Sequence, residues 1–364
     1  MKPSAILSLA LLAACAAPAK DIPLDLINLP DGFAVEVYAE GMSGARSMAL
    51  TPNGTLFLGT REREFFYAAQ DKDGDGTLET IHKIGEGLNA PNGLVFHDGA
   101  LYLAEVNRIT KWAGIENNLA SPGEPEVLID TLPTEAHHGW KYLALGPDNK
   151  LYFNIGAPCN ICNKEEEDER FATISRVNLD GSGFEIVARG VRNSVGIAFH
   201  PETQEMWFTD NGRDLMGDDR PPCELNFATE QGQHFGYPYC HGGTIPDPEF
   251  AADRDCDEFR APAVNMAAHV APLGLKFYTG DMFPEEYRGA VFIAEHGSWN
   301  RSIPDGYRLT FVKPGESEWN TFADGWLRRT RSWGRPVDIL FPPDGSMLVS
   351  DDKGGVVYRI TYEK

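Results

Sequence analysis

The amino-acid sequence predicts an all-β protein that folds as a six-bladed β-propeller in a single domain, residues 21–364. Paired apolar strands recur along the chain, turn residues join the two strands of each pair, and the pairs are regularly spaced. The segments that show this pattern begin at Met48, Gly93, Leu143, Ile197, Leu275 and Ile339. Turns rich in Gly, Pro, Asn and Asp are typical of β-hairpins. A spacing of about 45–55 residues is typical of propeller blades, and six copies therefore predict six blades.

One gap between copies is longer than the others, and it holds a Gly/Pro-rich loop between Cys240 and Cys256. An irregular β-sandwich is the alternative fold. The composition, 42% hydrophobic and 11% aromatic, is that of a folded globular protein. A formal net charge of −22 argues against binding to nucleic acid or to anionic lipid.

Residues 1–20 have the features of a bacterial export signal. Lys2 supplies a positive start, and residues 5–14 form an apolar run that is too short for a permanent membrane helix. A Cys directly after Leu-Ala-Ala predicts a lipoprotein in which Cys15 carries the lipid anchor, and residues 17–19 offer an ordinary cleavage site as the alternative. Either way we expect a periplasmic protein or an outer-membrane lipoprotein, with no transmembrane helix.

Export makes disulfide bonds possible. Cys240 and Cys256 bracket one loop and are candidates to close it. Residues 159–162 form a C-x-x-C whose flanks show no thioredoxin-like unit and no further zinc ligands, so we expect a structural bridge in a loop. Cys223 is then left free, although connectivity does not follow from sequence alone.

The predicted blades place two sets of residues on one rim. A tight hairpin joins the innermost strand of a blade to its neighbour, so the start of the first strand and the end of the second lie together at the opposite end. The starts carry Arg46, Asn92, His138 with Lys141, Arg192 with Asn193, His269 and Arg335. The ends are residues 60–61, 105–107, 155–156, 210–214, 295–296 and 351–352.

This rim gathers arginines in an acidic protein. Arg46, Arg192 and Arg335 would converge on the axis, where guanidinium groups bind carboxylates or phosphates bidentately. The sequence therefore predicts a pocket for an anion with several such groups. The alternative is that each arginine pairs with an Asp of the same rim.

Five stretches resemble the soluble quinoprotein sugar dehydrogenases of the glucose/sorbosone dehydrogenase family. They are HGWKYLALGPDNKLYFNIG, GVRNSVGIAFHPETQEMWFTDNGRD, GQHFGYPYCHGG, AEHGSWNRS and GRPVDILFPPDG. The resemblance is greatest to the pyranose dehydrogenase and sorbosone dehydrogenase branch. It implies a six-bladed propeller that uses pyrroloquinoline quinone and Ca²⁺ to oxidise a sugar.

The resemblance also implies roles for matching positions. His138 matches the catalytic base, which takes a proton from the anomeric hydroxyl of the sugar during hydride transfer to the quinone. Arg192 and Asn193 match the pair beside the reactive carbonyl of the cofactor, where positive charge stabilises a developing oxyanion. Arg335 matches an arginine that binds a cofactor carboxylate.

Gly212 and Arg213 match positions whose backbone carbonyls bind the calcium ion of the cofactor. Asp210 and Asp214 lie close enough in sequence to add carboxylate ligands, although the resemblance does not assign them. Asp71, Asp73 and Asp75 form the first half of a calcium-loop pattern, but His82 stands where the loop needs a bidentate acid. This second site is either a loose calcium site or an acidic turn.

The sequence departs from the family at two cofactor-binding positions. A lysine is expected within AEHGSWNRS, where only His296 or Arg301 could substitute for it. The second of two closely spaced arginines falls on Val337, and Arg46 or Arg61 could supply that charge from the first blade. These departures bear on the affinity for the quinone.

Three classes of function follow. The first is a quinone-dependent aldose or aldehyde dehydrogenase that passes electrons to a periplasmic acceptor such as a cytochrome c; the chain has no C-x-x-C-H of its own. The second is a calcium-dependent propeller hydrolase of the lactonase kind, and the third is a non-catalytic binding propeller. For a sugar, Trp299, Tyr237 and the loop between Cys240 and Cys256 are candidate substrate contacts.

Overall fold

The structure is a computed structural model that describes residues 22–251, 253–313 and 315–363. The predicted export signal and Cys15 lie outside the described residues. None of the helices in the described ranges is long and apolar enough to cross a bilayer.

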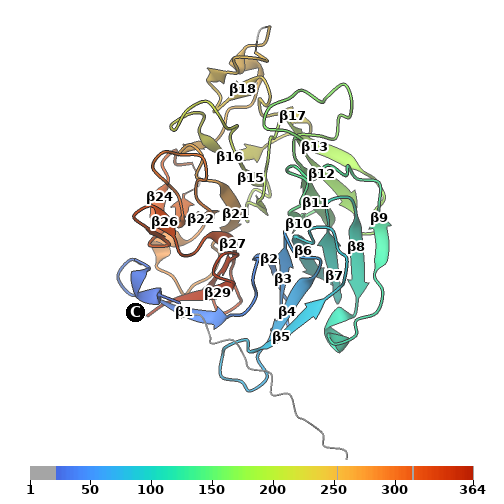
Figure 1. The fold of residues 1–364 in the computed structure, drawn as a ribbon, viewed down its shortest axis with the longest axis vertical. Coiled ribbons are helices and arrows are strands. Elements are labelled where there is room, and N and C mark those ends of the chain that lie inside the picture. The colour runs from blue at the N-terminus through green and yellow to red at the C-terminus, as the bar shows by residue number, and fades with distance from the viewer. Residues whose placement is uncertain (1–21, 252, 314, 364) are drawn as a thin grey trace, which may run out of the picture.

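Six sheets form the blades of a β-propeller, which confirms the predicted fold class (Figure 1). Blade 1 contains β2 (Ala45–Leu50), β3 (Leu56–Thr60), β4 (Phe66–Gln70) and β5 (Thr80–Ile84). Blade 2 contains β6 (Gly93–His97), β7 (Ala100–Ala104), β8 (Ile109–Ala113) and β9 (Glu126–Ile129). Blade 3 contains β10 (Leu143–Leu145), β11 (Lys150–Ile155), β12 (Thr173–Asn178), β13 (Glu185–Arg189) and the short parallel strand β17 (Gln233–His234).

The other three blades follow the same plan. Blade 4 contains β14 (Ile197–Phe199), β15 (Met206–Asp210), β16 (Cys223–Ala228) and β20 (Val264–Met266). Blade 5 contains β21 (Pro272–Phe277), β22 (Val291–Glu295), β23 (Arg308–Val312) and β24 (Asn320–Ala323). Blade 6 contains β27 (Pro336–Leu340), β28 (Met347–Asp351), β29 (Val356–Tyr362) and β1 (Phe33–Ala39).

Short hairpins and 3-10 turns lie outside the six blades. Two small hairpins pair β18 (Cys240–His241) with β19 (Ile245–Pro246) and β25 (Leu327–Arg328) with β26 (Arg331–Ser332). The 3-10 turns are η1 (Leu24–Leu26), η2 (Ile115–Asn118), η3 (Cys256–Glu258) and η4 (Glu285–Tyr287). In Figure 1 the β18 hairpin projects from the ring at the top of the view.

The two ends of the described chain meet in blade 6. Strand β1 pairs antiparallel with β29, with Phe33 opposite Tyr362, and the blue and red strands lie side by side in Figure 1. The innermost strands β2, β6, β10, β14, β21 and β27 each contact the next around the axis, and β27 returns to β2. Pairing of the first strand with the last therefore closes the ring.

The core lies between the blades. Strand side chains alternate between the two faces of a sheet, and each blade is covered by a neighbour on both faces. In β22, Phe292 and Ala294 pack toward blade 6, whereas Val291 and Ile293 pack toward blade 4. Blade strands are therefore apolar on both faces, which is why the sequence showed continuous apolar segments.

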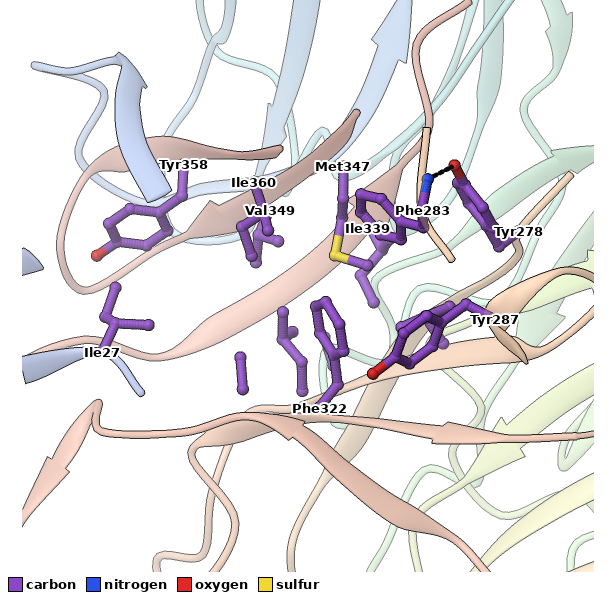
Figure 2. Packing of buried hydrophobic residues seen from close by; sticks show 14 of the residues in the cluster. Ile27, Tyr278, Phe283, Tyr287, Phe322, Ile339, Met347, Val349, Tyr358 and Ile360 are labelled. Carbon is purple, nitrogen blue, oxygen red and sulfur yellow. Dashed lines mark hydrogen bonds between the residues drawn. The ribbon is translucent and has the colours of Figure 1, made fainter. Parts of the chain in front are cut away.

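Aromatic side chains fill the interface between blades 5 and 6 (Figure 2). Phe292 is fully buried and meets Phe322 edge to face, with 5.0 Å between ring centroids. Tyr278 stacks on Phe283 and accepts a hydrogen bond from its backbone N–H at 2.7 Å, the dashed line in Figure 2. Edge-to-face and offset-stacked rings of this kind add to the burial of apolar area.

The disulfide expectations are confirmed. Cys240 is bonded to Cys256 and Cys159 to Cys162, while Cys223 is a buried free thiol. The first bond closes the long loop of blade 4, and the second lies in the connection between β11 and β12.

The interface between blades 5 and 6 leads to a stability prediction. We expect Phe292→Ala to lower the free energy of unfolding by about 3–5 kcal/mol, because a fully buried ring leaves a cavity that the closed ring cannot collapse. Val127→Ala in β9, where the side chain is 51% exposed, serves as control and should change it by less than about 0.5 kcal/mol. Urea unfolding measures both, and equal losses would contradict this account of the core.

Candidate functional site

A cavity of about 360 Å³ opens on the propeller axis at the predicted rim. The predicted residues that line it are Arg46, Arg61, His138, Arg192, Asn193, Gly212, Asp214, His296 and Arg335. A second cavity of about 380 Å³ adjoins it and shares Arg46, Arg61, His296 and Arg335. Four guanidinium groups thus border one cavity, and Asp214 is the one carboxylate among its described lining residues.

Irregular strand starts aim side chains at this cavity. The register shifts within the first residues of β2, β21 and β27, which marks bulges in three of the six innermost strands. A bulge bends its strand and redirects the local side chains. Arg46 lies in the bulge of β2 and is 2% exposed at the cavity wall.

His138 lies in a turn before β10. Its φ of 50° is in the left-handed region, which a residue with a side chain adopts only where its surroundings hold it. Its Nδ1 lies 2.9 Å from the carbonyl oxygen of Ala157. A carbonyl only accepts, so Nδ1 carries the proton and Nε2 is left with the lone pair. Burial lowers the pKa of His138 well below 6.5, and the positive charge of Arg192 lowers it further.

The turn also sets the orientation of the neighbouring histidine. If both histidines lay on a strand, His137 would point to the opposite face. Instead the two rings lie 4.0 Å apart, because neither residue belongs to a strand.

Arg192 is held by backbone and side-chain contacts together. Its N–H donates to Asp210 Oδ2 at 2.8 Å, and its Nη1 donates to the carbonyl of Asn211 at 2.9 Å. Asn193 N–H donates to the other Asp210 oxygen at 2.6 Å. The side-chain oxygen of Asn193 is buried and has no hydrogen-bond partner among the described residues.

Asp210 ends its strand as predicted, but its side chain lies behind the cavity wall. Both of its oxygens accept backbone amides, and it does not line the cavity. Burial and the nearby Glu224 raise the pKa of its carboxyl to about 7. Its place at the end of β15 makes it an anchor for the backbone of Arg192 and Asn193.

The predicted calcium segment is divided between two environments. Gly212 and Asp214 line the cavity, and Asp214 accepts a 2.6 Å bond from Asn300. The side chain of Arg213 points elsewhere, to Asp247 at 2.5 Å, and it thereby holds the loop that follows β19. Only the backbone of Arg213 is available for the role that the resemblance implies.

A second arginine is tied into the rim by a carboxylate. Arg46 Nη1 donates to Asp352 Oδ2 at 2.6 Å, and His296 Nε2 lies 2.9 Å from Asp352 Oδ1. Arg335 donates through Nε to the carbonyl of His296 at 2.9 Å. Burial lowers the pKa of His296 to about 4 although Asp352 attracts its proton, so the ring is neutral at neutral pH.

These positions answer which group can replace the missing lysine. Arg301 does not line the cavity, because its guanidinium group donates to the carbonyl of Asp218 and to the carboxylate of Asp219. The expectation that Arg301 could substitute for the lysine is therefore wrong. His296 lines the cavity but carries no charge at neutral pH. Arg61 lines it too, with its Cζ 4.8 Å from the centre of the Trp140 ring, and brings a charge from blade 1.

Some lining residues were not among the predicted catalytic, cofactor or metal residues. Trp140, His269, Trp299 and Asn300 border the cavity. His269 stood at a predicted strand start and Trp299 among the candidate sugar contacts, whereas nothing in the sequence marked Trp140 or Asn300. Tyr237 and the loop between Cys240 and Cys256 do not line the cavity. Tyr237 is buried, and its hydroxyl contacts Cys159 and Cys162 instead.

Cys223 borders the same cavity. Burial raises the pKa of its thiol to about 11, so it stays protonated and is a poor nucleophile at neutral pH.

The acidic loop of blade 1 lies apart from the cavity. Carboxylate oxygens of Asp71, Asp73 and Glu79 lie within 4.8 Å of one another between β4 and β5. Asp75 is not part of this group, because its Oδ1 accepts from the backbone and hydroxyl of Thr77. Glu79 was not foreseen as the third acid.

Comparison with known proteins supplies the family. The Glucose / Sorbosone dehydrogenase family pattern matches residues 104–298, more than half of the chain. This chain belongs to the glucose/sorbosone dehydrogenase family. A TrAA12-like pattern matches residues 243–363.

Relatives of this family member span nearly the whole chain. It is 34% identical to an uncharacterized protein of Borreliella burgdorferi over 93% of this chain and 91% of that one. It is 24% identical to a pyrroloquinoline quinone-dependent sugar dehydrogenase of Hypocrea jecorina, covering 90% and 87% of the two chains. The calcium structure of a Trichoderma reesei protein of carbohydrate-active enzymes family AA12 matches with a TM-score of 0.83, 19% identity and coverage of 96% and 100%, which supports the fold.

The surroundings of His138 give a prediction for this member of the glucose/sorbosone dehydrogenase family. In the cofactor-free protein, NMR titration of the ring should give a pKa well below 6.5. Arg192→Ala should raise that pKa, because it removes a nearby positive charge that disfavours the imidazolium.

Arg189→Ala is the matched control, since Arg189 pairs with Glu169 at the surface and should leave His138 unchanged. An ordinary pKa for His138 in the unmodified protein would contradict the burial described above.

Proposed function

We propose that this protein is a quinoprotein oxidoreductase that oxidises an aldose or related sugar aldehyde at C1. Hydride would pass to pyrroloquinoline quinone and then, as electrons, to an acceptor such as a cytochrome c. The observation that carries the proposal is a neutral, buried His138 in a cavity bordered by four guanidinium groups. Membership of the glucose/sorbosone dehydrogenase family supports it.

The cavity residues fit an anionic planar cofactor. Arg46, Arg61 and Arg335 offer donors for its carboxylates, and guanidinium groups bind such groups in a planar fork. Two nitrogens of Arg335 donate to the carbonyls of His296 and Gly297, which fixes the plane of that group. The side-chain oxygen of Asn193 is buried and has no hydrogen-bond partner among the described residues. Buried polar atoms are normally hydrogen-bonded, so a bound ligand that donates to this oxygen would satisfy it.

A calcium ion would belong beside Gly212. Backbone carbonyls of Gly212 and Arg213, with the carboxylate of Asp214, are hard oxygen donors of the type that Ca²⁺ prefers. Asp210 is left out of this proposed set because it does not line the cavity.

The protein groups perform acid–base and electrostatic work. When bound, pyrroloquinoline quinone supplies the hydride acceptor. Nε2 of His138 takes the proton of the sugar hydroxyl, because Ala157 holds Nδ1–H and burial keeps the ring unprotonated. Arg192 lies on the same cavity wall, where its charge stabilises negative charge that develops next to the histidine.

A lactonase-like hydrolase fits the cavity less well. That chemistry uses a metal held mainly by Glu, Asn and Asp side chains on the axis. Here guanidinium groups dominate, and one carboxylate lines the cavity among the described residues. A non-catalytic propeller that binds an anion is the other alternative, and the experiments below distinguish it from the dehydrogenase.

Export is part of the proposal. The signal-like start of the chain and two disulfide bonds support a periplasmic or membrane-anchored location, where a sugar and a cytochrome c would both be accessible. Labelling of Cys15 with a fatty acid in the producing bacterium distinguishes the anchored form from the free form.

Reconstitution tests the activity. Purified protein with pyrroloquinoline quinone and Ca²⁺ should reduce an artificial dye with one or more aldoses of a panel, and omission of either addition should abolish the rate. His138→Ala should lower kcat by roughly 10²–10⁴-fold, because the general base is lost.

His97→Ala in β6 is the control and should keep the activity. Tight quinone binding without turnover of any aldose would favour the binding propeller, and absence of quinone binding at micromolar concentration would overturn the proposal.

The arginine cluster predicts cofactor affinity. Arg335→Ala should weaken quinone binding by about tenfold or more, because it removes a charge-assisted contact and a share of the positive field. Quenching of tryptophan fluorescence measures it, since Trp140 and Trp299 border the cavity.

Arg328→Ala, at an exposed position in β25, serves as the control for the change in net charge. The same loss of affinity in both variants would show that total charge, not this position, governs binding.

A further inference from the structure

The segment between β11 and β12 forms a wall behind the cavity. It includes the disulfide loop, residues 159–162, and neither cysteine lines the cavity. The roles proposed above use none of these four residues. Their contacts nevertheless lead directly to the residues that were assigned roles.

Asn160 bonds to Arg192 through two oxygens. Arg192 Nε donates to the backbone carbonyl of Asn160 at 2.8 Å, and Arg192 Nη2 donates to its side-chain Oδ1 at 2.9 Å. A two-point contact of this kind fixes both the position and the plane of a guanidinium group.

The same side chain also holds the start of the next loop. Oδ1 of Asn160 accepts the backbone N–H of Asp214 at 2.8 Å, and its Nδ2 donates to the Asp214 carbonyl at 3.2 Å. One amide therefore joins Arg192 to Asp214 and leaves none of its polar atoms unused.

The acceptors around Arg192 are almost all neutral. They are the carbonyl and Oδ1 of Asn160 and the carbonyl of Asn211, while the carboxylate of Asp214 lies farther away, at 3.4 Å. An amide oxygen orients a guanidinium group without neutralising it. The charge of Arg192 thus stays available to the cavity.

The segment reaches His138 as well. Ala157 accepts from His138 Nδ1, and its own N–H donates to the carbonyl of Arg192 at 2.8 Å. At Gly156 an added Cβ would lie 2.6 Å from the Cβ of His138, so only glycine permits this approach. The proposed base and the proposed cofactor arginine thus share one support.

The disulfide bond fixes the support. It closes a loop around Asn160 and removes backbone freedom that a single side chain could not restrain. The hydroxyl of Tyr237 accepts the N–H of Cys162 at 3.0 Å and packs the loop from the far side.

We propose that Asn160 is a positioning residue that orients Arg192 and Asp214 without compensating their charge, and that the Cys159–Cys162 disulfide keeps it in place. The inference rests on the proposed function for the identity of the group that Arg192 faces. The arrangement of Asn160, Arg192 and His138 can be tested without any cofactor.

Two substitutions separate orientation from charge. Asn160→Ala removes the side-chain oxygen and leaves the guanidinium group held only by the carbonyls of residues 160 and 211 and by the longer Asp214 contact. Asn160→Asp keeps that oxygen and loses only the amide donor, but it pairs Arg192 with a carboxylate. Asn163→Ala is the matched control, because Asn163 lies next to the loop and bonds outward to Tyr239.

The first measurement is the pKa of His138 in the cofactor-free variants by NMR titration. Both Asn160 variants should raise it by roughly 0.5 pH unit or more, because the positive charge of Arg192 moves away in one and is compensated in the other. The control should not change it. A carboxylate at this position raises the pKa of His138 by itself, so Asn160→Ala is the deciding variant. A role of Asn160 limited to the shape of the loop predicts no shift in Asn160→Ala.

The second measurement is the dissociation constant for pyrroloquinoline quinone by tryptophan fluorescence. We expect about tenfold weaker binding in both Asn160 variants, and a similar loss in the Cys159→Ser/Cys162→Ser double variant, which keeps the Cys240–Cys256 bond. Folded Asn160 variants with an unchanged His138 pKa would overturn the inference. If the unmodified protein binds no quinone, the proposed function fails, and the His138 titration still decides the role of Asn160.

Discussion

Closure of the ring is the constraint on which the site depends. Pairing of β1 with β29 forces the six innermost strands around one axis, and only then do their first residues face one another. Arg46 of blade 1 and Arg335 of blade 6 lie far apart in sequence and yet border the same cavity. Burial of apolar side chains between blades, including the aromatic cluster of blades 5 and 6, offsets the cost of bringing like charges together.

A repeated device anchors the arginines at their backbones. In blade 4 the last residue of β15, Asp210, accepts the N–H of Arg192 at 2.8 Å. In blade 6 the last residue of β28, Asp351, accepts the N–H of Arg335 at 2.9 Å. In both blades a buried carboxylate at the end of the second strand thus fixes the backbone of an arginine in the segment that leads into the first strand. These acids belong to the framework of the blades, so acidity near the site is not by itself a sign of a metal ligand.

The sequence predicts the frame well because hairpin repeats fix which strand ends meet. It predicts side-chain direction less well, as Arg213 and Arg301 illustrate: both follow blade strands, and both turn away to partners that become neighbours only in the folded chain. The charge state of His296 could not be predicted from the sequence either, because burial in the folded protein lowers its pKa. Asn160 gave no signal, since a lone Asn inside C-x-x-C looks like an ordinary turn residue.

The cavity also divides its charge unevenly. Arg46 meets the carboxylate of Asp352 at 2.6 Å, so much of its charge is compensated at the rim. Arg192 meets mainly neutral oxygens, so its charge acts on the cavity. That charge lowers the pKa of His138 and would also stabilise negative charge on a ligand beside it. Burial and this only partly compensated arginine together keep His138 unprotonated, and the shorter contacts of Arg192 go to neutral amide oxygens while the carboxylate of Asp214 lies at 3.4 Å.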